Sequence, residues 1–180
     1  MESFQPVIDF WFSELSPAQW WKKSSDLDNT IARKFVGLHG AASRGELYPW
    51  REQALGRLAE IIVLDQFSRN IYRDSAQAFA TDNLALILAQ HAVALKVQQG
   101  FSMDQKAFLY MPFMHSESSL IHQQAAKLYN EPELESNLKF ELRHKEIIDR
   151  FGRYPHRNAI LGRTSSREEI EFLKQPGSSF

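Results

Sequence analysis

Three stretches of the sequence bring acidic, basic and histidine side chains together at spacings that could do chemistry. In the first, IIVLDQFSRNIYR at 61–73, Asp65 follows four apolar residues, and Arg69 and Arg73 come one and two helical turns later. Residues four apart share a helix face, so the carboxylate and guanidinium groups can meet. Two interpretations are open: Asp65 and Arg69 form a shielded ion pair, or the arginines bind an anionic ligand while Asp65 holds one of them.

The second stretch is MPFMHSES, residues 111–118. We expect Pro112 to interrupt the preceding helix and a serine to cap the next one, with Glu117 in its first turn, where the helix dipole favours an acid. Capping alone would explain these residues. Alternatively, His115 beside Glu117 at a helix N-terminus forms a corner suited to acid/base chemistry or to anion binding.

Metal and cofactor binding are not expected from these residues. His115 and His122 are seven positions apart and lack the four-residue spacing of a helical metal pair. The chain has no cysteine, and it contains neither a glycine-rich phosphate loop nor a His-Glu-x-x-His motif. We therefore predict no metal site and no cofactor.

The third stretch is RFGRYPHRNAILGRTSS, residues 150–166. Gly152 can end the preceding helix, and the link that follows is long and rich in hydrogen-bond donors. Residues 139–163 hold seven Lys or Arg against three Asp or Glu. This excess of positive charge should be balanced by acids elsewhere in the chain, such as Asp65 or Glu117, or by an anionic ligand. The candidate ligand-binding side chains of this stretch are Arg153, His156, Arg157 and Asn158.

Helices are expected to position all three stretches. The chain has no Asn-Gly or Asp-Gly hairpin turn and no sustained period-two alternation, whereas helix start and stop signals are frequent. Helices should begin near Pro17, Ser25 and Ser166, and a central one should cover 51–67. Eight or so helices with one apolar stripe each predict an all-α protein, an antiparallel helical array. Further helices are expected over 82–99, 115–129 and 132–151.

Length and composition predict one soluble globular domain over residues 1–180. The chain is 43% hydrophobic and 24% charged, with 13 phenylalanines for a core of large rings. A net charge of -1 argues against binding to nucleic acid or to an anionic membrane, and no apolar run is long enough to span a bilayer. The lack of cysteine and of a secretory signal predicts a cytoplasmic protein.

The three stretches together resemble a bacterial family of domains of unknown function, number 924. The matching motifs are LDQFSRNIYR at 64–73, PFMHSES at 112–118 and FGRYPHRNAILGR at 151–163, with DFWF at 9–12 and WW at 20–21 in addition. The resemblance covers essentially the whole chain and implies an all-helical fold similar to tetratricopeptide arrays. The family brings no established activity, so it gives no residue a catalytic role. It usually has Pro where this chain has Ser68.

Three classes of function are open. The favoured hypothesis is a binding protein that holds a small anionic ligand or an acidic peptide in a cleft lined by arginine and histidine. The second is an enzyme acting on an anionic substrate, with His115 or His156 as proton carrier and Glu117 or Asp65 orienting it. The third is a scaffold for protein partners, which predicts an exposed apolar groove. The predicted ligand site consists of Asp65, Arg69, Arg73, His115, Glu117, Arg153, His156, Arg157 and Asn158.

Overall fold

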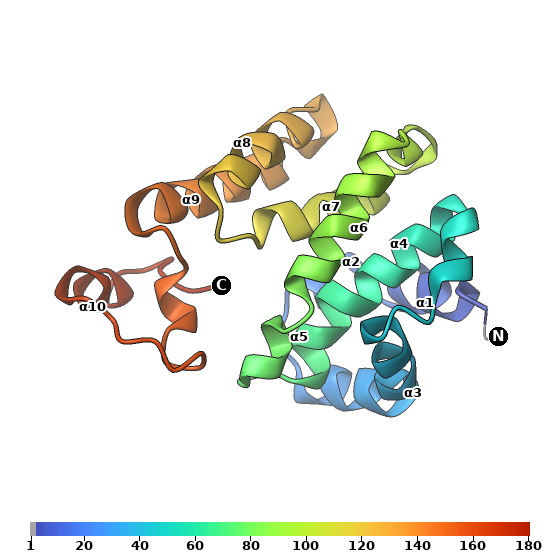
Figure 1. Cartoon of the computed structure of the whole chain (residues 1–180), viewed down its shortest axis with the longest axis horizontal. Helices are drawn as coiled ribbons and strands as arrows, with labels where there is room; N and C mark the ends of the chain where they lie inside the picture. The colour runs from blue at the N-terminus through green and yellow to red at the C-terminus, as the bar shows by residue number, and fades with distance from the viewer. Residues whose placement is uncertain (1–2) are drawn as a thin grey trace. The chain divides into compact units, whose positions relative to one another are not determined.

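The computed structural model describes residues 3–180, and these residues form helices and connecting loops without a strand (Figure 1). The prediction of an all-α protein is confirmed. Contacts divide the chain into two compact units. Unit 1 comprises the described residues up to Arg73 together with Gln77–Pro112, and unit 2 comprises Asp74–Ala76 and Phe113–Phe180. The single domain over 1–180 stays a prediction.

Unit 1 consists of helices joined by short links (Figure 1). Its first and fourth α-helices run directly into π-helical segments, the second of which leads on into α5. The α-helices are α1 Gln5–Asp9, α2 Pro17–Trp20, α3 Ser25–Ser43, α4 Ala54–Ile62, α5 Ser68–Ile71, α6 Asp82–Ala94 and α7 Met103–Met114, and the last two residues of α7 belong to unit 2. The π-helical segments are η1 Phe10–Glu14 and η3 Val63–Phe67, and 3₁₀ turns cover η2 Tyr48–Glu52, η4 Ala76–Phe79 and η5 Val97–Gly100.

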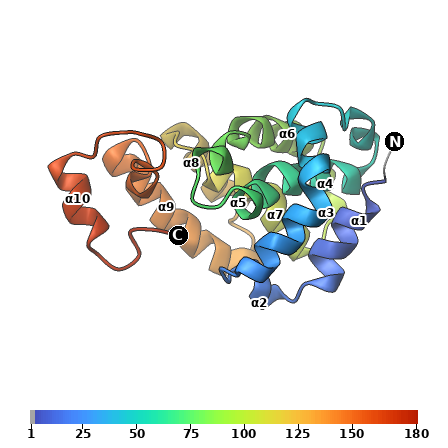
Figure 2. The same cartoon turned by 90° about the horizontal axis from the view of Figure 1, so that it is seen from below.

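The helical run of α4, η3 and α5 carries the core of unit 1. It contacts both α3 and α6 (Figure 2). Residues 61–64 and Phe67 are completely buried, which confirms the central helix predicted over 51–67, although the α-helix begins only at Ala54. Phe67 packs edge-on against Trp11 of η1, with 5.6 Å between ring centroids. Burial of such large rings is the main favourable term in folding.

The helix ends predicted from the sequence are close to the observed helix ends. Ser16 and Gln19 form a capping box at the start of α2. The helix predicted from Ser25 does begin there, but its cap is Ser24, whose hydroxyl oxygen accepts a hydrogen bond from the Leu27 amide at 3.3 Å. Gly45 follows the helix with a φ of +74°, a conformation that glycine adopts without strain. Local signals thus placed these ends within a residue or two.

The predicted interruption at Pro112 is wrong. Helix α7 continues through Pro112 and ends at Met114. Proline removes the amide hydrogen that would bond the carbonyl four residues earlier, and its ring crowds that carbonyl. Phe113 and Met114 are each only 4% exposed, so their burial stabilises the last turn.

Unit 2 starts with a helical hairpin. α8 Ser119–Leu128 and α9 Glu135–Phe151 lie side by side, joined through the 3₁₀ turn η6 Pro132–Leu134 (Figure 1). The helix predicted over 115–129 begins later than expected, because residues 115–118 form the link after α7. Amides and carbonyls of that link are therefore available to the rest of unit 2.

The end of α9 and the start of the last helix are as the sequence predicts. Gly152 follows α9 with a φ of +66°, and Ser166 and Glu169 form the capping box of α10 Arg167–Leu173. Between them lies a loop with one 3₁₀ turn, η7 Pro155–Arg157. Each helix within residues 3–180 is too short or too polar to cross a membrane.

Candidate functional site

In unit 1 the predicted ion pair of Asp65 and Arg69 is present and includes a third residue. Asp65 is 1% exposed and lies in η3. Arg69 Nη1 donates to the backbone carbonyl of Asp65 at 2.8 Å and to its Oδ1 at 3.1 Å. The same guanidinium donates to both oxygens of Asp82, at 2.9 and 3.0 Å. Because Asp82 is the first residue of α6, Arg69 ties the central run to α6.

Arg73 binds α3 in a similar way. Its Nε and Nη2 donate to the Asp28 carboxylate at 2.5 and 2.7 Å, and Asn70 Nδ2 donates to the same carboxylate at 2.8 Å. Burial would raise the pKa of Asp28, but the bonds from Arg73 and Asn70 outweigh it and lower this pKa. These contacts join helices of unit 1, and a ligand role for Asp65, Arg69 and Arg73 stays a prediction.

A buried histidine and serine of unit 1 stand close enough to suggest nucleophilic catalysis. His39 Nε2 lies 2.6 Å from Ser68 Oγ, and Ser68 Oγ lies 2.7 Å from Thr81 Oγ1. Thr81 in turn donates to the carbonyl of Leu64 at 2.6 Å. A carbonyl only accepts, so the Thr81 hydrogen is used there and the Ser68 hydrogen must point at Thr81. His39 is then the donor to Ser68 and cannot be its base, and the chain of bonds is structural.

In unit 2, Glu117 of the second stretch binds the third stretch. Arg163 Nη1 donates to Oε2 at 2.6 Å and Nη2 to Oε1 at 2.9 Å, while the backbone amide of Tyr154 donates to Oε1 at 2.7 Å. Burial would raise the pKa of Glu117, but these hydrogen bonds outweigh it and lower this pKa. Both oxygens of Glu117 are thus engaged, which weakens the enzyme hypothesis in which Glu117 orients a histidine.

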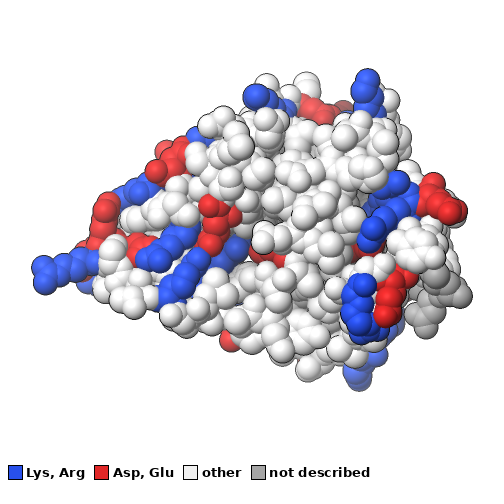
Figure 3. Space-filling model, in the orientation of Figure 1, with Lys and Arg blue, Asp and Glu red and all other residues white. Residues whose placement is uncertain are grey.

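The other arginines of the third stretch bind the acids of α10. Arg153 donates from Nε and Nη2 to the two oxygens of Glu169 at 2.7 and 2.8 Å, and Arg150 Nη2 lies 2.7 Å from Glu168 Oε1. The Arg153 bonds lower the pKa of Glu169 to about 2. Around α10, basic and acidic side chains are accordingly interleaved (Figure 3). Much of the excess positive charge of 139–163 is therefore balanced by Glu117, Glu168 and Glu169.

The remaining nitrogen-rich side chains of unit 2 gather around Tyr154, which is completely buried. Ring centroids of His122, His144 and His156 lie 6.2, 5.9 and 5.6 Å from that of Tyr154, and the Arg157 Cζ lies 4.6 Å from it. We call these five residues the Tyr154 cluster. Within residues 3–180 no group of three or more histidines and acids is placed to hold a metal ion.

His144 of the Tyr154 cluster is a neutral imidazole. His144 is 6% exposed, and its Nδ1 donates to the Phe140 carbonyl at 2.7 Å, so Nε2 is the unprotonated nitrogen of the neutral ring. Burial lowers the pKa of His144 to about 3, although the hydrogen bond to the Phe140 carbonyl acts in the opposite direction. His115 lies close enough to His144 to interact with it electrostatically. A base of such low pKa is poorly matched to catalysis near neutral pH.

Hydrogen bonds of the Tyr154 hydroxyl join it to α7 and α8. Its hydroxyl donates to the Met114 carbonyl at 2.5 Å and lies 3.1 Å from His122 Nε2. His122 Nδ1 lies 2.7 Å from Glu141 Oε1 on α9. Tyr154 is thus bonded to the end of α7 and to the first half of α8, and His122 in turn links α8 to α9. Asn158, at 1% exposure, donates to Ser165 Oγ within the loop at 3.0 Å.

The sequence predicted some members of this site and missed others. His115, Glu117, Arg153, His156, Arg157 and Asn158 all lie in unit 2, whereas Asp65, Arg69 and Arg73 lie in unit 1. Tyr154, His144 and Arg163 were missed. The spacing of Glu141, His144 and Ile148 places all three on the buried face of α9, and this pattern was the available signal for His144.

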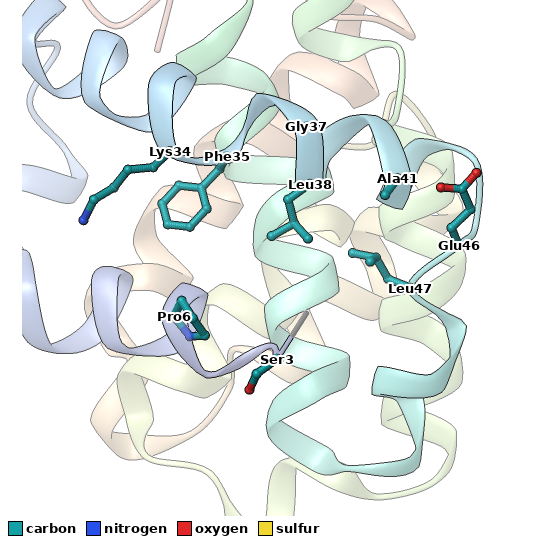
Figure 4. Close-up of a pocket in the computed structure, with 9 residues that line it drawn as sticks. All are labelled: Ser3, Pro6, Lys34, Phe35, Gly37, Leu38, Ala41, Glu46 and Leu47. Atoms are coloured by element: carbon teal, nitrogen blue, oxygen red, sulfur yellow. The ribbon is translucent and has the colours of Figure 1, made fainter. Parts of the chain in front are cut away.

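Unit 1 has an apolar groove of about 840 Å³ beside α3 (Figure 4). Phe35, Leu38 and Leu47 line it, with Lys34 and Glu46 among its charged residues. Both charges already have partners, since Lys34 Nζ lies 3.1 Å from Glu14 and Glu46 accepts from Arg44 at 2.7 Å. The groove fits the scaffold hypothesis in its apolar character, but its charges select no particular partner.

Comparison with known proteins agrees with this geometry. A protein of unknown function from Agrobacterium tumefaciens has a solved structure that is 38% identical in sequence, covers 95% of this chain and 96% of its own, and superimposes with a TM-score of 0.90. No curated protein matches the chain. The family model described as a bacterial protein of unknown function, DUF924, matches residues 7–177. The chain therefore belongs to the DUF924 family, as its motifs predicted.

Proposed function

We propose that this protein is a cytoplasmic binding protein for a small anionic ligand, which is held in unit 2 by the cationic side of the Tyr154 cluster. Arg157 and His156 supply the charged and polar donors, His115 lies within electrostatic reach of His144, and Asn158 lies on the same loop as Arg157. The arrangement would recognise a carboxylate or a phosphate group, for which a guanidinium is the best-matched partner.

The observation that carries the proposal is the concentration of basic groups around one buried ring. Arg157 is 5% exposed and lies 4.6 Å from the Tyr154 centroid, with three histidines within 6.2 Å of the same ring. Burial is the main cause of the low pKa of His144, so its ring is neutral near neutral pH and the Arg157 guanidinium is the charged group beside Tyr154. An anion placed there would be attracted to the Arg157 guanidinium, so its binding would be favoured.

The two alternatives have weaker support. An enzyme would need a carboxylate free to orient His115 or His156, but Glu117 is bound to Arg163 and Tyr154, and Asp65 accepts from Arg69 in unit 1. A scaffold would use the groove beside α3, whose charges are paired. Binding without chemistry is therefore the function that the contacts support best.

The test is a thermal-shift screen of phosphorylated and carboxylated metabolites, followed by calorimetry on the hits. We expect Arg157→Ala to weaken anion binding about 10- to 100-fold, the effect of losing a charge-assisted bidentate contact. Arg157→Lys should recover only part of that loss, because an ammonium cannot bind two oxygens in the same plane.

Arg143→Ala is the matched control. Arg143 also lies over an aromatic ring, 5.9 Å from Phe140, but it is exposed on α9. Its removal changes the net charge by the same amount and should leave affinity unchanged. The proposal fails if no anion raises the melting temperature, or if Arg157→Ala lowers stability while binding persists at the wild-type affinity.

A further inference from the structure

The last residue of the chain is packed into the Tyr154 cluster. The Phe180 ring packs against two imidazoles, 3.7 Å from the His144 centroid and 4.5 Å from the His156 centroid. It meets Tyr154 edge-on at 5.2 Å and 85°. Three aromatic side chains from α9 and the following loop thus form a slot around one phenyl ring. The ring itself is still 54% exposed, so the slot opens to solvent.

The sequence after α10 directs Phe180 back to this slot. Gly177 has a φ of +78°, which turns the chain. Ser178 is 5% exposed, and its hydroxyl donates to the Leu173 carbonyl at the end of α10 at 3.1 Å. The segment from Gly177 to Phe180 is therefore a short tether with one side-chain anchor.

The slot and the cationic groups share one ring. Arg157 lies 4.6 Å from the Tyr154 centroid and Phe180 lies 5.2 Å from it, so a ring in the slot contacts the same tyrosine that Arg157 covers. Imidazole and phenol rings favour tilted and edge-on contacts with a planar ring, as observed for Phe180. Neither contact is available to a small anion without a ring.

We propose that the His144, Tyr154 and His156 slot is the ring subsite of the anion-binding site, and that Phe180 is a tethered competitor for it. The ligand is then a planar aromatic ring bearing a carboxylate or a phosphate. Phe180 must leave the slot before this ring enters. This inference rests on the proposed function, and it adds the ligand class and a built-in control of affinity.

The tether makes a quantitative prediction. If the Phe180 ring occupies the slot about 90% of the time, the apparent affinity for an aromatic anion is about tenfold below its intrinsic value. Phe180→Ala should therefore bind phenylacetate and phenyl phosphate about tenfold more tightly than the wild-type chain. Ser178→Ala, which removes the anchor, should change affinity in the same direction by a smaller factor. Because Phe180 is half exposed, its removal should leave the fold intact.

The experiment is a titration of the full chain with each probe. Binding is monitored by calorimetry and by the nitrogen chemical shifts of the histidine rings. The probes are phenylacetate and phenyl phosphate, with acetate, inorganic phosphate and cyclohexylacetate as ligands that lack a planar ring. Phe140→Ala is the matched control, because it removes a phenyl ring of similar exposure, 57%, from outside the slot. We expect a gain in affinity only for the aromatic anions and only when Phe180 or Ser178 is changed.

The outcomes separate the two proposals. If acetate or phosphate binds with dependence on Arg157, and Phe180→Ala leaves the affinity for phenylacetate and phenyl phosphate unchanged, the ring subsite is refuted while the anion site stands. Equal gains for cyclohexylacetate and phenylacetate would also refute a planar-ring subsite. If none of the anions binds to wild type or Phe180→Ala, both proposals are refuted.

Discussion

His122 and Glu141 form a completely buried pair that shares one proton. Both side chains are 0% exposed, and His122 Nδ1 lies 2.7 Å from Glu141 Oε1. His122 Nε2 faces the Ser116 carbonyl at 2.8 Å, which can only accept, so this nitrogen carries a hydrogen. The contact at Nδ1 then needs one further proton, on the imidazole or on the carboxyl. Burial raises the pKa of Glu141, which favours the carboxyl.

Glu141→Gln tests this protonation. The glutamine amide can donate to Nδ1 as the carboxylic acid does, so we expect little loss of stability at pH 4.5. An acid whose pKa is raised by folding stabilises the folded state fully below its ordinary pKa of 4.5. This stabilisation declines as pH rises through the raised pKa. The wild-type chain should therefore lose stability relative to the variant from pH 4.5 to 8 in urea unfolding. Exposed Glu146→Gln is the control, and parallel curves for wild type and Glu141→Gln would contradict the assignment.

His144 should make the protein sensitive to acid. Burial lowers its pKa from 6.5 to about 3, so the unfolded chain binds a proton that the folded protein excludes. The contribution of His144 to the free energy of unfolding is complete above pH 6.5. It falls as pH drops, by up to about 1.4 kcal/mol per pH unit for one such group. Relative to wild type, His144→Phe should flatten this decline, whereas exposed His91→Gln should not. Long-range nitrogen NMR should show a neutral His144 ring, with the hydrogen on Nδ1, at pH 5.

Arg153 and Arg150 offer a direct comparison of a shielded and an exposed ion pair. Glu169 is 2% exposed, whereas Arg150 and Glu168 are 48% and 63% exposed at their side chains. Arg153→Ala should lower the free energy of unfolding at pH 7 clearly more than Arg150→Ala does, because it leaves a buried carboxylate without its main donor. Arg150→Ala should cost no more than about 0.5 kcal/mol. Equal losses in denaturant unfolding would refute this ranking.

The same ion pair predicts a pH dependence. The Arg153 hydrogen bonds lower the pKa of Glu169 from 4.5 to about 2. An acid whose pKa is lowered by folding stabilises the folded state above its ordinary pKa. This stabilisation is lost as pH falls through the folded-state pKa. Wild type should therefore lose this contribution between about pH 4.5 and 2, and Arg153→Ala should show a shallower acid decline over the same range.

Ser68→Ala should break the buried chain of hydrogen bonds in unit 1. The substitution leaves the His39 Nε2 hydrogen without its acceptor and removes the donor to Thr81. Each buried polar group left unsatisfied costs on the order of 1–3 kcal/mol, so the melting temperature should fall by several degrees. Ser43→Ala, at an exposed position of α3 whose hydroxyl donates to the His39 carbonyl at 2.8 Å, should have a much smaller effect. Similar losses for both variants would contradict the assignment.

The sequence by itself determined the helices and most of their ends. The capping box of Ser166 and Glu169 and the positive φ of Gly152 depend on residues within a few positions, and they are present as predicted. The Asp65 and Arg69 pair follows from one helix face in the same way. Pro112 is the exception, because burial of the residues after it outweighs the single hydrogen bond that proline removes.

Only the tertiary structure decided which side chains meet. Glu117 binds Arg163, which is 46 residues away, and Phe180 reaches His144 across α10 and two loops. Such pairs depend on how α8, α9 and the following loop pack, and no local pattern encodes them. The sequence showed an excess of positive charge and a set of candidate residues. Packing also gathered the histidines around Tyr154. It paired most arginines with acids of the chain, because a buried charge is stable only beside a partner that compensates its lost hydration.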